Sequence, residues 1–164
     1  MAARSVTVQR LTFISQRPFK EVLDRLSSKI GHPDMRSFKQ GISTAATEEE
    51  LELLVHRAVG PADLMEFHRL DLGEVLRKEP GPKARQSLRL LVGNPLIMKQ
   101  MVKRVPDAGS YAPVTLLLDE RADGVHLTYD TMASYLAPYG ESEALKVARD
   151  LDNKVEALLA EAAD

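Results

Sequence analysis

Cysteine and tryptophan are absent from this sequence of 164 residues, and aromatic residues make up only 5% of it. Without cysteine the chain can form no disulfide, thiolate zinc site or iron–sulfur cluster, and it has no thiol nucleophile. Long apolar runs are also missing: unbroken aliphatic stretches such as Leu116 to Leu118 are no longer than four residues, which is far too short to span a bilayer. The first residues lack the apolar core of a secretory signal peptide, so we expect a cytoplasmic protein without membrane contact.

The composition, with 44% hydrophobic and 28% charged residues, is typical of a globular protein. We expect a single domain whose core covers about residues 4–163. The net charge is only −2, but residues 81–106 hold six basic groups and no acidic one: Lys83, Arg85, Arg89, Lys99, Lys103 and Arg104. One interpretation is a site for an anion or a nucleic acid. The segment has no aromatic residue for base stacking, which argues against nucleic acid.

Hydrophobic spacing predicts the elements of the first half. We expect a strand over 4–14, a helix over 18–30, a helix that begins at the capping box Thr47–Glu50 and ends before Gly60, and a strand over 64–70. Residues 31–46 show no period and contain Gly, Pro, Ser and Thr, so we expect a long loop there.

The second half is more regular. We expect a strand over 87–92, a helix from Pro95 to about 105, a hairpin of strands over 114–119 and 125–129, and a long final helix capped by Ser142. Asn94 is placed to cap its helix, with Pro95 at the first helical position. The final helix carries one apolar stripe, which must lie across a sheet. The order predicts an α+β fold: a curved antiparallel sheet of about five strands with helices packed on one face.

Several short motifs occur together in the second half. They are Gly93-Asn94-Pro95, Asp107-Ala108-Gly109 with Ala112-Pro113-Val114, and Asp123-Gly124 leading into Thr128-Tyr129-Asp130. In this order and spacing they resemble the domain of unknown function 302 family, roughly over residues 5–163. The resemblance implies a TATA-binding-protein-like fold with a β-α-β(4)-α core, assembly as a homodimer, and no settled activity. The family often has Asp-His where this chain has Asp71-Leu72, so no histidine-based site is carried over.

The sequence offers weak candidates for a site. Asp130 could act as a general base with Tyr129 or His126 beside it. The ligand-binding candidates are residues that could rim or line a pocket: Asn94, Met98, Met101, Tyr111, Tyr129 and Tyr135. His68 and His126 lack the spacing of metal ligands, so we expect no metal and no cofactor.

Three functions follow from these features. The favoured one is a homodimeric, non-catalytic module that holds a small or apolar ligand between the sheet and the final helix, with strand 64–70 as a candidate edge for pairing across a twofold axis. The second is an enzyme of unknown reaction that uses the pocket near Asp130. The third is anion or nucleic-acid binding through residues 81–106.

Overall fold

The computed structural model describes residues 3–78 and 85–164 and shows an α+β fold. Its sheet has five strands in the order β1-β5-β4-β3-β2, and every neighbouring pair is antiparallel. The strands are β1 (Arg10–Ser15), β2 (Met65–Asp71), β3 (Ser87–Gly93), β4 (Val114–Arg121) and β5 (Gly124–Asp130). The predicted fold class is therefore confirmed. The part of the basic segment that contains Lys83 lies outside the described residues.

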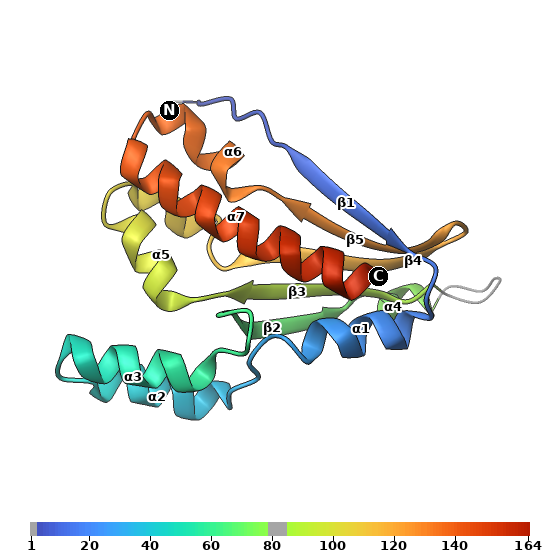
Figure 1. Ribbon diagram of the computed structural model, residues 1–164, viewed down its shortest axis with the longest axis horizontal. Helices are drawn as coiled ribbons and strands as arrows, with labels where there is room; N and C mark the ends of the chain where they lie inside the picture. Colours follow the sequence, from blue (N-terminus) through green and yellow to red (C-terminus); the bar gives the residue numbers. More distant parts are fainter. Residues whose placement is uncertain (1–2, 79–84) are drawn as a thin grey trace.

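The α-helices of the described chain are α1 (Phe19–Ser27), α2 (Met35–Thr44), α3 (Glu48–Ala58), α4 (Leu72–Leu76), α5 (Pro95–Val102), α6 (Met132–Leu136) and α7 (Ser142–Ala163). Two short 3-10 turns, η1 (Pro106–Ser110) and η2 (Ala137–Tyr139), complete the described part of the chain. Helix α7 runs along the sheet, while the α2–α3 hairpin lies beyond β2 (Figure 1). No described helix is both long and apolar enough to cross a membrane.

The core lies between one face of the sheet and the helices. Alternate strand residues such as Leu90, Leu116 and Leu127 are fully buried against α7, because successive side chains of a strand point to opposite faces. The predicted stripe on α7 is buried as well, from Ala144 to Ala162. We call the opposite side of the sheet its open face, since Thr12 and Arg89 are exposed there.

The structure corrects the expected loop over residues 31–46, which contains α2. The Asp34 carboxylate caps this helix by accepting from the Ser37 amide at 2.8 Å. Phe38 is buried in a small second core with Val55 and Met65. Packing against α3, rather than the helix propensity of its own residues, stabilises α2.

Several boundaries also differ from the prediction: α1 ends at Ser27 rather than at residue 30, and α5 ends at Val102 rather than near residue 105. The long final helix is capped by Glu141 instead of Ser142, because the Glu141 carboxylate accepts from the Ala144 amide at 2.6 Å. A carboxylate at this position also interacts favourably with the helix dipole. The first strand begins only at Arg10, where pairing with Asp130 of β5 begins.

Candidate functional site

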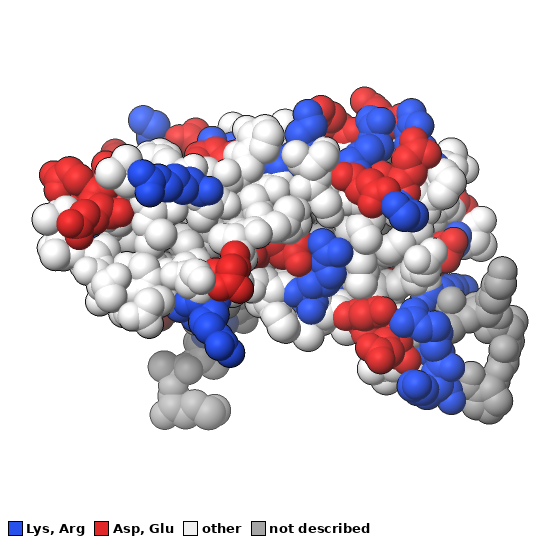
Figure 2. All heavy atoms as spheres, turned by 90° about the horizontal axis from the view of Figure 1, so that it is seen from below, with Lys and Arg blue, Asp and Glu red and all other residues white. Residues whose placement is uncertain are grey.

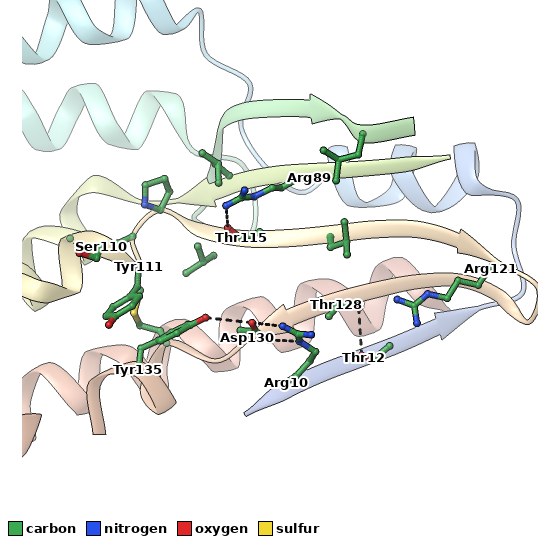
Figure 3. A pocket seen from close by; sticks show the side chains of 18 residues that line it. Arg10, Thr12, Arg89, Ser110, Tyr111, Thr115, Arg121, Thr128, Asp130 and Tyr135 are labelled. Atoms are coloured by element: carbon green, nitrogen blue, oxygen red, sulfur yellow. Dashed lines mark hydrogen bonds and ion pairs between the residues drawn. The ribbon is translucent and has the colours of Figure 1, made fainter. Parts of the chain in front are cut away.

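A pocket of about 810 Å³ occupies the open face of the sheet. Four strands, the segment 109–113 and helix α6 contribute to its wall (Figure 3). Its polar side chains come mainly from alternate positions of the strands: Arg10, Thr12, Arg89, Thr115, Arg121, Thr128 and Asp130. Such positions are rigid, because each is fixed by the hydrogen-bond ladder of the sheet.

Arg10 and Asp130 are register partners on β1 and β5. Their side chains form two parallel bonds, in which the guanidinium donates to the carboxylate over 2.6 Å and 2.8 Å. The Arg10 guanidinium lowers the pKa of Asp130 from its ordinary value. Asp130 is therefore ionised at neutral pH and is a weak proton acceptor.

Arg89 differs from the other two arginines of the pocket. Its Nη2 atom donates to the Thr115 hydroxyl over 3.4 Å, and no carboxylate of the described residues forms an ion pair with it. Arg121, in contrast, binds the Asp119 carboxylate at 2.7 Å. With two of the three arginines neutralised, the described residues of the pocket leave one positive charge uncompensated.

Two tyrosines form one end of the pocket. The rings of Tyr111 and Tyr135 stack with their centroids 4.3 Å apart and an angle of 12° between their planes. The Tyr135 hydroxyl lies 3.4 Å from the Asp130 carboxylate. Burial raises the pKa of Tyr135, and the nearby charge of Asp130 raises it further. The stack thus gives the pocket a flat, mostly apolar wall with a protonated hydroxyl.

A smaller cavity of about 150 Å³ lies near the amino-terminal end of α5. Met98, Met101, Ile97 and Phe67 give it an apolar wall. Asn94 also lines it, but the Asn94 side chain is already engaged. Its Oδ1 accepts from the Leu96 amide at 2.9 Å, and its Nδ2 donates to the Asp63 carboxylate at 3.0 Å. Asn94 is thus the helix cap that the sequence predicts.

Tyr129 points away from the pocket, into the core. Its hydroxyl donates to the Asp152 carboxylate over 2.5 Å. The amides of Met132 and Ala133 donate to the same carboxylate, over 2.7 Å and 3.0 Å. Burial raises the pKa of Asp152, although the three donors oppose that shift. Burial and the adjacent carboxylate also raise the pKa of Tyr129. This cluster joins β5 to the start of α6 and to α7.

The residues proposed from sequence are therefore divided among separate places. Tyr111, Tyr135 and Asp130 meet in the large pocket, whereas Asn94, Met98 and Met101 line the small cavity. The structure does not assemble the candidate catalytic group. His126 Nε2 lies 2.9 Å from the Asp123 carboxylate, and its backbone is about 13 Å along the strand from Asp130. Tyr129, next to Asp130, faces the other side of the sheet.

Sequence reasoning missed the contribution of Arg10, Thr115 and Arg121 to the pocket. The signal was the alternation of polar residues on strands whose other positions are apolar, as in Arg10-Leu11-Thr12. Among the described residues, no group of three or more His, Asp or Glu side chains is arranged to hold a metal ion.

The basic residues of segment 85–106 do not gather into one patch. Arg89 lies in the pocket, Lys99 binds Glu48 of α3 at 2.5 Å, and Arg104 lies 3.7 Å from Glu141. Figure 2 shows another face of the molecule, on which basic and acidic side chains are interspersed. Interspersed charges of both signs give no extended field for a polyanion.

Comparison with known proteins agrees with the fold described above. The model of the family named domain of unknown function DUF302 matches residues 40–162. The chain belongs to this family, as its motifs predict. Among solved structures, it resembles the crystal structure of an uncharacterized conserved protein DUF302 from Bacillus stearothermophilus. The TM-score is 0.64 at 14% identity, over 93% of this chain and 97% of that chain. This similarity shows a shared fold. No curated protein matches the chain.

Proposed function

We propose that this protein is a binding module that holds a small organic monoanion on the open face of its sheet. The observation that carries the proposal is the guanidinium of Arg89, which no carboxylate of the described residues neutralises, in a pocket of about 810 Å³. A guanidinium presents a rigid fork of donors that matches a carboxylate or a phosphate. The hydroxyls of Thr115 and Thr128 are further hydrogen-bonding groups in the wall.

The charge of the wall supports a monoanion. Arg10 and Arg121 are neutralised by Asp130 and Asp119, so Arg89 leaves a balance of one positive charge. A second anionic group on the ligand would have to displace one of these carboxylates. The stacked Tyr111 and Tyr135 favour a ligand with an apolar part as well as its charge.

Binding is better supported than catalysis. A general base works best when its pKa lies near the operating pH. Arg10 instead lowers the pKa of Asp130, and neither Tyr129 nor His126 lies beside that carboxylate. The predicted position of the ligand changes too, because core side chains fill the space between the middle of the sheet and α7.

We also propose that the module is a homodimer, as the family resemblance implies. Strand β2 is an edge of the sheet. Gly31 bridges its beginning at Met65, and the strand edge beyond that point can pair with a second copy across a twofold axis. Beside it lie exposed apolar side chains, of which Val75 is 71% and Leu76 is 45% exposed. Burial of these side chains in a dimer would remove them from water.

The anion proposal is tested by isothermal titration calorimetry with hexanoate and benzoate, each compared with its neutral amide. We expect the carboxylates to bind and the amides to bind at least about tenfold more weakly, since a hydrogen bond to a charged group contributes about 1.5 to 3 kcal/mol. Arg89→Gln should abolish this preference. Arg149→Gln is the matched control, because Arg149 is exposed and lies outside the pocket wall. Equal binding of acids and amides, or an unchanged preference in Arg89→Gln, contradicts the proposal.

A further inference from the structure

The large pocket and the small apolar cavity share part of their wall. Ala112, Pro113 and Val114 line both of them. Along β3, Arg89 and Leu91 line the large pocket and Gly93 lines the small cavity. These three residues occupy alternate positions of one strand, so they point to the same face. The open face of β3 thus leads from a cation, past an apolar side chain, to an apolar cavity.

Gly93 leaves open space beside Pro113 in the wall of the small cavity. A Cβ atom at this position would lie 3.4 Å from Cβ of Pro113 and 3.6 Å from Cε2 of Phe67. These are contact distances, so even one methyl group would occupy the space between the two side chains. The small cavity beyond it is lined by Met98 and Met101, whose flexible thioethers adapt to chains of different shape.

We propose that the ligand is a single-chain aliphatic acid that fills both cavities, a proposal that rests on the anion site at Arg89. The carboxylate binds the Arg89 guanidinium beside Thr115. The chain passes Leu91 and Pro113, and its end lies in the small cavity. An apolar wall at one end and an uncompensated cation at the other match the two parts of such a molecule.

The dimensions set the chain length. Residues two apart on a strand are separated by about 7 Å, which is the step on β3 from Leu91, the register partner of Thr115, to Gly93 at the small cavity. An extended chain advances about 1.2 Å per bond, so about six bonds cover this step. A dry apolar cavity of about 150 Å³ accepts a molecule the size of benzene, or about six carbons. The best ligand should therefore have about ten to twelve carbons.

The experiment is a calorimetric series of butanoate, hexanoate, octanoate, decanoate and dodecanoate, each below its micelle concentration. Burial of each added methylene should raise the affinity about fourfold, until the cavity is full near decanoate or dodecanoate. Two variants block the path. Ile42→Glu places a charge at the wall of the small cavity, and Gly93→Ala fills the gap beside Pro113. Leu53→Glu is the control, because Leu53 is 56% exposed on the neighbouring helix and outside the cavity wall.

The inference is supported when affinity rises with chain length in the wild type and in Leu53→Glu but no longer rises beyond hexanoate in either blocking variant. Acids that bind through Arg89 with an affinity independent of chain length overturn the aliphatic ligand and leave the anion site intact. If affinity still rises with chain length in Ile42→Glu and Gly93→Ala, the inference is overturned as well, because the aliphatic chain then lies outside the small cavity. If no acid binds, the anion site itself is wrong, and the inference fails with it.

Discussion

The buried cluster of Tyr129 and Asp152 gives the sharpest stability prediction. The Tyr129 hydroxyl donates to Asp152 over 2.5 Å and accepts from the Met132 amide over 3.2 Å. Tyr129 is only 1% exposed, so water cannot replace the lost hydroxyl in a Tyr129→Phe variant. A hydrogen bond to a charged group contributes about 1.5 to 3 kcal/mol of net stability. We therefore expect the substitution to lower the free energy of unfolding by about 2 kcal/mol.

For a domain of this size, each kcal/mol lost lowers Tm by about 2 to 4 °C. Differential scanning calorimetry at neutral pH should thus show a decrease of about 4 to 8 °C for Tyr129→Phe. Tyr135→Phe is a matched control. It removes the same atom from a half-buried ring whose hydroxyl contact is 3.4 Å long, and it should change Tm by about 2 °C at most.

Asp152→Asn extends the test, because it removes the shared acceptor. One position of the carboxamide becomes an NH₂ group that faces an amide donor, so we expect a larger decrease than for Tyr129→Phe. Equal Tm values for the wild type and Tyr129→Phe would refute the reasoning. The same holds if the two tyrosine variants lose equal stability, since burial would then have no effect on the cost of losing the hydroxyl.

Two further predictions concern the ion pair and the dimer. Because Arg10 lowers the pKa of Asp130, the pair stabilises the fold above the unfolded-state pKa of about 3.9 and loses this contribution as the pH falls through the lower folded pKa. In urea titrations, the free energy of unfolding should therefore fall less between about pH 7 and pH 3 in Asp130→Asn than in the wild type. Equal decreases in the two proteins would exclude a contribution of the Arg10–Asp130 pair to the pH dependence of stability. Val75→Glu should convert the proposed dimer to a monomer in light scattering, whereas Val8→Glu should not; a wild type that is monomeric rejects the dimer.

Sequence patterns predicted the strands and α7 well because their apolar residues follow one period over a long stretch. Helix α2 shows why the prediction of other elements from sequence fails. The prediction of a loop without a period over residues 31–46 overlooked the helical spacing of Met35, Phe38 and Ile42, a local signal that Gly41 and Thr44 weaken. The helix is fixed by contacts with the next helix, α3, since a Cβ at Gly41 would lie 2.9 Å from the Leu54 side chain. Such close packing is not visible in a local pattern.

The pocket was harder to predict than the fold. Strand alternation alone already separates Tyr129 from Asp130, so the failure of that pair could have been foreseen. Which face of the sheet is open could not be predicted, because β4 has leucines at three consecutive positions, Leu116, Leu117 and Leu118. Either side of such a strand can face a core. Register across four strands, which no local pattern gives, brings Arg10, Asp130, Thr115 and Arg89 together.

Consecutive residues of β5 point to opposite faces of the sheet, and contacts on both faces position helix α6. On the inner face, Tyr129 and Asp152 hold the amides of Met132 and Ala133 at the start of α6. On the open face, the next residue, Asp130, binds Arg10 and lies beside Tyr135, which α6 carries. The aromatic wall of the pocket thus depends on a carboxylate that never touches it. A buried charge is costly to retain unless its hydrogen bonds are satisfied, and here those bonds set the position of α6. We conclude that the inner cluster is a positioning device for the pocket as well as a source of stability.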